Sequence, residues 1–116
     1  MENNLVIWHN PACSKSRQTL QLLRDRGFQP VEINYQKSPP SPEEIAAVLK
    51  KLNLKPRELM RKGQSIYKEL NLKDESDESK LIDAMFHYPI LIERPVVING
   101  DKAAIGRPPE AVLSIL

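Results

Sequence analysis

The single cysteine, Cys13, is the residue of this sequence best placed to do chemistry. It follows a short apolar run, Leu5–Trp8, and a proline-containing loop, and helical spacing begins at Cys13 or Ser14. Unpaired backbone N–H groups and the positive end of the helix dipole at such a position stabilise a thiolate and can also hold an anion. The position therefore favours a nucleophile that attacks an oxyanion, although a lone cysteine can also be buried and inert.

Two neighbours of Cys13 could support its thiolate. Ser16 lies three residues further on, so its hydroxyl can face the sulfur across the first helical turn. His9 could hydrogen-bond to the thiolate or favour it electrostatically, or it could be a strand-end histidine with only a local backbone bond. We take Cys13, His9 and Ser16 as the candidate catalytic residues.

Three arginines occur at the ends of expected elements. Arg61 follows a short helical piece, whereas Arg94 and Arg107 each precede a proline, which favours extended backbone. Ligands gather at element ends in open α/β sheets, and the guanidinium fork suits a tetrahedral oxyanion. Spacing alone also permits three solvated side chains. The candidate substrate-binding residues are Arg61, Arg94 and Arg107.

The elements that must position these residues form an α/β pattern. Strands are expected over Leu5–Trp8, Val31–Tyr35, Val96–Ile98 and Lys102–Ile105, with helices from Cys13 or Ser14 to about Arg26, from Pro42 to about Leu52, from about Asp77 to His87, and from Pro108 to Leu116. A capping box at Ser41 and a hairpin signal at Asn99-Gly100 are the clearest boundaries. The order β-α-β, helices only, then β-β-α predicts a mixed four-stranded sheet flanked by helices.

Composition excludes several classes of protein. A chain of 116 residues supports one domain over 1–116. The net charge of +2, from 17 basic and 15 acidic residues, does not indicate nucleic acid or an anionic membrane as a partner. No apolar run approaches the ~20 residues of a membrane span. We expect a monomer with no membrane and no nucleic-acid contact.

The cysteine count and the N-terminus bear on compartment and metals. One cysteine allows no intramolecular disulfide and no Cys-rich zinc site, and any metal site would need carboxylates beside His9 or His87. The opening residues, Met1-Glu2-Asn3-Asn4, lack the basic start and apolar core of a signal peptide. These observations predict a cytoplasmic protein with no bound metal.

Nine consecutive residues, His9-Asn10-Pro11-Ala12-Cys13-Ser14-Lys15-Ser16-Arg17, resemble the His-Asn-Pro-x-Cys-x-x-Ser-Arg signature of the glutaredoxin-coupled arsenate reductases, the ArsC family. The resemblance is to the short subgroup and continues along nearly the whole chain. Further segments that resemble the family are Tyr35–Pro40, Leu59–Lys62, His87–Pro95 and Gly106–Pro108.

The resemblance implies a thioredoxin-like fold with a central helical insertion, at about residues 41–88. It implies that Cys13 is the nucleophile and that the three arginines named above hold the arsenical. It further implies that His9 helps to keep the thiolate, that Ser16 hydrogen-bonds to it, and that the peptide bond before Pro95 is cis.

The implied activity is reduction of arsenate to arsenite, with glutathione as co-substrate, glutaredoxin as partner and no bound cofactor. A single cysteine fits this class rather than the reductases that form an internal disulfide and use thioredoxin. Two alternatives stay open: a regulator of the Spx kind, which binds transcription machinery, and a general monothiol oxidoreductase. Spx proteins usually carry Cys-x-x-Cys, and Ser16 occupies the second cysteine position here.

Overall fold

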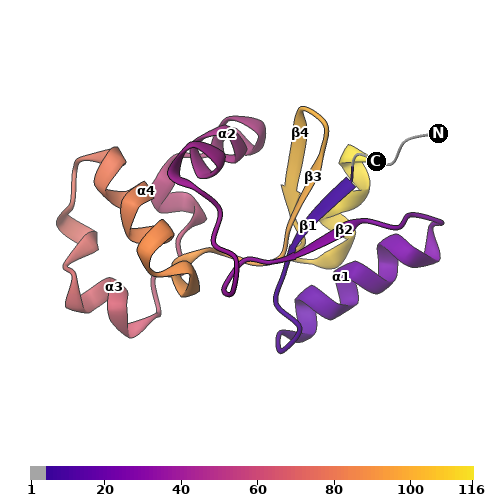
Figure 1. Ribbon diagram of the computed structural model, residues 1–116, viewed down its shortest axis with the longest axis horizontal. Coiled ribbons are helices and arrows are strands. Elements are labelled where there is room, and N and C mark those ends of the chain that lie inside the picture. Colours follow the sequence, from indigo (N-terminus) through magenta and orange to yellow (C-terminus); the bar gives the residue numbers. More distant parts are fainter. Residues whose placement is uncertain (1–4) are drawn as a thin grey trace. The chain divides into compact units, whose positions relative to one another are not determined.

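The computed structural model describes residues 5–116 (Figure 1). The expectation about a signal peptide depends on residues 1–4, which lie outside the described part. The chain divides into two compact units, one of Met1–Ser38 with Arg94–Leu116 and one of Pro39–Glu93. The single domain expected over residues 1–116 stays a prediction.

The first unit is built on a mixed four-stranded sheet. Its strands are β1 Leu5–His9, β2 Val31–Asn34, β3 Val96–Asn99 and β4 Lys102–Ile105. The strand order is β2-β1-β3-β4, with β1 parallel to β2 and the other pairs antiparallel. This confirms the predicted sheet. The boundaries differ slightly, because His9 still pairs within β1 and Tyr35 lies beyond β2.

Helix α1, Ser14–Asp25, and the 3₁₀ helix η4, Pro109–Ile115, pack on this sheet and on each other (Figure 1). The buried cluster between them and the strands comprises Leu5, Ile7, Leu20, Leu23, Val97, Val112 and Ile115. Alternate side chains of β1 supply it, as the period of a strand requires. The C-terminal helix is thus present as predicted, but as a 3₁₀ helix of seven residues, which is longer than 3₁₀ helices usually are.

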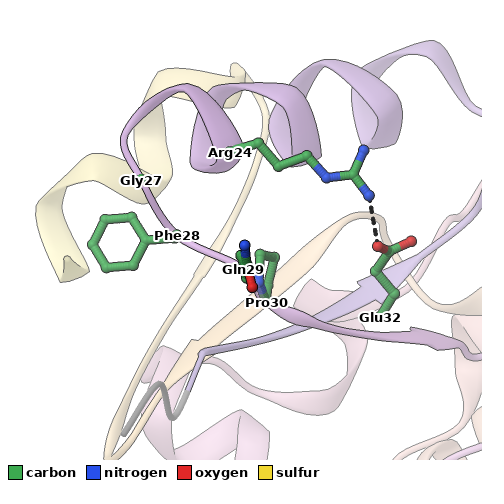
Figure 2. A pocket seen from close by; sticks show the side chains of 6 residues that line it. All are labelled: Arg24, Gly27, Phe28, Gln29, Pro30 and Glu32. Carbon is green, nitrogen blue, oxygen red and sulfur yellow. Dashed lines mark hydrogen bonds and ion pairs between the residues drawn. The ribbon is translucent and has the colours of Figure 1, made fainter. Parts of the chain in front are cut away.

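The end of α1 is tied to the sheet by an ion pair. Gly27 has φ +86°, a conformation that suits glycine, and it turns the chain from the helix towards β2. Figure 2 shows Arg24 reaching from α1 to Glu32 of β2, where Nη2 and Oε2 lie 2.8 Å apart. The pocket drawn there, which Phe28 and Pro30 also line, is at the C-terminal end of α1, and Cys13 precedes the other end.

The second unit is helical, and its elements all fall between β2 and β3 in the chain. They are α2 Pro42–Leu52, η1 Pro56–Leu59, α3 Ser65–Glu69, η2 Leu72–Asp74, α4 Glu78–His87 and η3 Pro89–Leu91. The predicted capping box is present, because Ser41 Oγ accepts from the Glu44 N–H at 3.1 Å and Glu44 Oε1 accepts from the Ser41 N–H at 3.0 Å. The 3₁₀ turns η2 and η3 were not predicted.

Candidate active site

The loop between β1 and α1 presents Cys13 at the start of the helix. Asn10 organises the loop: its side-chain Oδ1 accepts from the Ala12 N–H at 3.0 Å, and its carbonyl accepts from the Cys13 N–H at 2.9 Å. Cys13 itself is the N-cap residue, with extended backbone at φ −94° and ψ 123°. Its carbonyl accepts the first helical bond, from Arg17 N–H at 3.0 Å. The structure thus places Cys13 where the sequence predicted it.

The surroundings of Cys13 favour its thiolate. Partial burial raises the pKa of the thiol. The backbone N–H groups of Ser16 and Lys15 and the guanidinium of Arg94 lower it by a larger amount, so the pKa of Cys13 lies below its ordinary value. The side chain remains partly accessible. A thiol that ionises more readily and can be reached from solvent has the properties of a nucleophile rather than of an inert core residue.

His9 and Ser16 form a buried pair behind the cysteine. Ser16 Oγ lies 2.6 Å from His9 Nδ1 and accepts from the Asn10 N–H at 3.0 Å, so it links the end of β1 to the first turn of α1. Burial lowers the pKa of His9, and the negative charge of Glu32 offsets only part of this effect. The lowered pKa keeps the ring neutral at pH 7. A hydrogen bond from Ser16 to the sulfur and a role for His9 in the thiolate stay predictions.

Arg94 interacts with the cysteine, and Arg107 is hydrogen-bonded to Arg94. The Arg94 side chain interacts with Cys13 both as a hydrogen-bond donor and as a charge. Arg107 donates from Nη1 to the Arg94 carbonyl at 3.3 Å. Both arginines precede cis peptide bonds, which confirms the prediction for Pro95 and adds Pro108, which was not predicted.

Arg61 belongs to the second unit. Its backbone N–H donates to the Leu91 carbonyl at 2.7 Å, and its Nη1 lies 3.5 Å from the Ile90 carbonyl. These contacts fix the segment that carries Arg61 beside η3. Its part in a substrate site stays a prediction.

Thr19 and Gly106 support the site, and the sequence analysis did not identify them. Thr19 is fully buried, and a Cβ on Gly106 would lie 2.5 Å from Thr19 Oγ1 and 2.9 Å from Pro95 Cγ. The Gly106 N–H donates to the Pro95 carbonyl at 2.9 Å. Glycine is therefore required where the segment before Arg107 crosses α1. The only signal in the sequence was a glycine before Arg-Pro, with nothing to indicate its partner in α1.

Residues 5–116 offer neither a metal-binding cluster nor a membrane-spanning helix. Within that range no group of three or more His, Cys, Asp or Glu side chains could hold a metal ion. No helix in the same range has the length and apolar character to cross a membrane.

Comparisons with known proteins agree with this geometry. The model of the ArsC family matches residues 8–115. An arsenate reductase of Haemophilus influenzae is 47% identical, with 97% of this chain and 99% of that protein covered. An arsenate reductase of Escherichia coli K12 is 40% identical, with 98% and 82% covered. The solved structure of an arsenate reductase from Vibrio cholerae, 46% identical, superimposes with a TM-score of 0.97 over 100% of both chains.

Proposed function

The chain belongs to the ArsC family, and we propose that it reduces arsenate to arsenite through the thiolate of Cys13. Glutathione is the co-substrate and glutaredoxin the partner in this proposal, with no bound cofactor. The protein acts as a monomer in the cytoplasm, where thiols are kept reduced. One observation carries the proposal: the thiol with the lowered pKa lies at the helix start beside Arg94.

The first step joins arsenate to the enzyme. The Cys13 thiol and dihydrogen arsenate condense, so that a sulfur–arsenic bond forms, an arsenic–oxygen bond breaks and water leaves. Arsenic stays at oxidation state five. The helix N–H groups and the arginines balance the negative charge of the oxyanion, which otherwise repels a thiolate.

The second step is the reduction. The glutathione thiol attacks the Cys13 sulfur, a sulfur–sulfur bond forms, and the sulfur–arsenic electron pair leaves with arsenic, which becomes As(III). The proton of the thiol goes to the departing arsenite. Glutaredoxin then removes glutathione from the mixed disulfide by thiol exchange and restores Cys13. The second thiol comes from glutathione because the chain has no other cysteine.

The remaining residues have supporting roles in this proposal. Arg94 and Arg107 bind the arsenate oxygens from the first unit, and Arg61 supplies the third guanidinium. Ser16 and neutral His9 hold the first turn of α1 in place, and so keep its N–H groups directed at the sulfur. Positioned donors of this kind stabilise charge without reorganising during the reaction.

A coupled assay tests the proposal. NADPH consumption is followed with glutathione, glutathione reductase, glutaredoxin and arsenate, and arsenite is measured directly as product. We expect turnover that depends on all three of arsenate, glutathione and glutaredoxin, and that is abolished in Cys13→Ser. Arsenite production by a purified and verified Cys13→Ser protein would contradict it.

The same assay separates the alternatives. A general monothiol oxidoreductase would consume NADPH with a glutathione mixed-disulfide substrate and no arsenate. A regulator of the Spx kind would turn over neither substrate. We expect arsenate-dependent activity to exceed the arsenate-free activity clearly.

A further inference from the structure

The second unit contains a pocket whose lining is mostly basic. It has a volume of about 580 Å³, and residues of η1, α3 and η2 and of the segments that join them line it. The lining residues are Arg57, Lys62, Tyr67, Lys68, Asn71 and Lys73. We call it the basic pocket. Four of the six are positively charged and none is acidic, so the pocket concentrates charge in a protein whose net charge is only +2.

Arg57 is held in a fixed position in this pocket. Its Nη2 donates to the backbone carbonyl of Leu72 at 3.1 Å and also to that of Glu75, so the side chain ties η1 to η2 and to the residue that follows η2. Both acceptors are uncharged, and Arg57 forms no ion pair in the described part of the chain. Its Nε is buried without a hydrogen-bond partner. A half-buried guanidinium with no counter-charge costs free energy, which an anion bound beside it would offset.

Three lysines add to the positive charge of Arg57. Lys62, Lys68 and Lys73 are exposed, and their side chains take part in no hydrogen bond or ion pair among residues 5–116. The acidic residues that follow two of them in the chain, Glu69 and Asp74, do not line the pocket. Cations gathered in one pocket repel one another, and their summed field attracts an anion. The ammonium groups are therefore available to a negatively charged ligand.

The charge and the volume together indicate the class of ligand. A terminal phosphate group carries roughly −1.5 to −2 charge near pH 7, so a ligand needs more than one phosphate group to match four cations. Arginine binds phosphate through its planar fork, and lysine binds it as a point charge. The volume lies in the range of sites for organic molecules, roughly 300–1,000 Å³, and so leaves room beyond the phosphate groups. Tyr67 and Asn71 complete the lining, and an aromatic ring and an amide suit a heterocycle.

We propose that the basic pocket binds a nucleoside diphosphate, with the phosphate groups on Arg57 and the three lysines and the ring system against Tyr67. Lys62 follows Arg61 in the chain, but Arg61 does not line the pocket, and its own bonds run to the carbonyls of Leu91 and Ile90. No residue of the candidate active site lines the basic pocket. The inference therefore goes beyond the proposed function and does not depend on it.

Three ligands test the class in the parent protein. Calorimetric titrations with ADP, AMP and pyrophosphate are compared in a magnesium-free buffer, and we expect ADP to bind most tightly. AMP should bind about fivefold more weakly, because one phosphate group and its exposed ion pairs are missing. Pyrophosphate should also bind more weakly than ADP, because it has no ring to place against Tyr67. Equal affinities for AMP and ADP would overturn the diphosphate assignment, and equal affinities for pyrophosphate and ADP would overturn the contact with Tyr67.

Lysine variants test the position of the site. Lys68→Gln and Lys73→Gln should each weaken ADP binding by about two- to fivefold, the size of an exposed ion pair, and the double variant should weaken it further. Lys50→Gln, in α2, removes the same charge from the same unit outside the pocket and is the matched control. Arg57 is left unchanged in these proteins, because its bonds to the carbonyls of Leu72 and Glu75 hold the pocket together. Equal losses in Lys50→Gln and Lys68→Gln would show attraction to net charge without a site and would overturn the proposal.

Two further measurements locate the ligand. During titration with ADP, backbone amide NMR shifts should concentrate in residues 57–73, and shifts centred elsewhere would contradict the assignment. Added salt should weaken ADP binding in the parent, and it should do so less in the Lys68→Gln, Lys73→Gln double variant, because fewer ion pairs are left to screen. The double variant should keep the parent KM for arsenate. A raised KM for arsenate with unchanged ADP affinity would assign these lysines to arsenate binding and overturn the inference.

Discussion

The side chain of Arg107 donates a hydrogen bond from Nη1 to the backbone carbonyl of Arg94 at 3.3 Å. The two residues are 13 positions apart and precede the two cis peptide bonds of the chain's described part. Arg94 also interacts with Cys13 as a charge and as a hydrogen-bond donor, so the Arg107 side chain is bonded to the residue whose guanidinium favours the thiolate. The positions of the two arginines are therefore coupled.

The coupling makes a prediction about the thiol pKa. Arg94→Ala should raise the pKa of Cys13 towards the unperturbed value of about 8.5, because a favourable charge and a hydrogen bond to the thiolate are lost. Arg26→Ala, at the far end of α1, is the matched control and should not change it. Thiolate absorbance and alkylation rate against pH provide the measurement. A parent protein that titrates near 8.5 would contradict the site as described.

The lowered pKa of Cys13 also predicts a pH dependence of stability. Between the folded and unfolded pKa values, the folded protein holds a thiolate while the unfolded chain still binds the proton. The unfolded state therefore binds more protons, and the free energy of unfolding should rise with pH across that window. Cys13→Ser should lose this part of the pH profile. Urea titrations at a series of pH values, with parent and variant in parallel, measure the difference.

The pKa of His9 should lie below its ordinary value, and His9 should affect Cys13 mainly by holding Ser16 and the first turn of α1 in place. Burial lowers its pKa, so as pH falls through the unfolded value of about 6.5 the unfolded chain gains a proton that the folded protein does not, and stability decreases. Ring NMR shifts against pH measure this pKa. His9→Gln should change the Cys13 pKa less than Arg94→Ala does, provided its circular dichroism matches the parent. A larger effect from His9→Gln would show that His9 acts on the thiolate directly.

Local signals in the sequence predicted most of the sheet and the best-defined helices. Ser41 and Glu44 form a capping box within one helical turn, Gly27 ends α1, and Asn99-Gly100 lies at the β3–β4 turn. Each of these features depends on residues close together in the chain, so the pattern of residue types is sufficient to predict it.

Contacts between distant residues could not be predicted in the same way. Thr19 approaches Gly106 across 87 positions, and the bond from Arg107 to Arg94 depends on how β3 and β4 pair. The sequence indicated arginines suited to an oxyanion, but only the fold shows that Arg94 interacts with Cys13. The described bonds of the Ser16 hydroxyl run to His9 and Asn10, because the end of β1 lies directly against the first turn of α1, and its expected hydrogen bond to the sulfur stays a prediction.

The arginines should contribute unequally to turnover. Charged hydrogen bonds are worth roughly 1.5–3 kcal/mol, so Arg94→Ala and Arg107→Ala should each lower kcat/KM for arsenate by about 10- to 100-fold. Arg61→Ala tests the substrate-binding role proposed for Arg61. Arg94→Ala should have the larger effect of the first two, because it also raises the thiol pKa. Replacement by lysine instead of alanine should restore only part of the lost kcat/KM, since the planar guanidinium fork is missing. Sulfate or phosphate should compete with arsenate. Parent-like kinetics in Arg94→Ala would exclude it from the site.

The close approach at Gly106 predicts a loss of stability without any change to a charged group. In Gly106→Ala the new methyl would meet Thr19 Oγ1 at 2.5 Å and Pro95 Cγ at 2.9 Å, so we expect the free energy of unfolding to fall by about 1–3 kcal/mol. Thr19→Ala in the same protein should relieve part of the clash, because the Pro95 contact remains. Gly63→Ala has no atom within 4 Å of the new methyl and is the control. Urea unfolding midpoints give the comparison, and equal midpoints for Gly106→Ala and Gly63→Ala would contradict the described packing of Gly106 against α1.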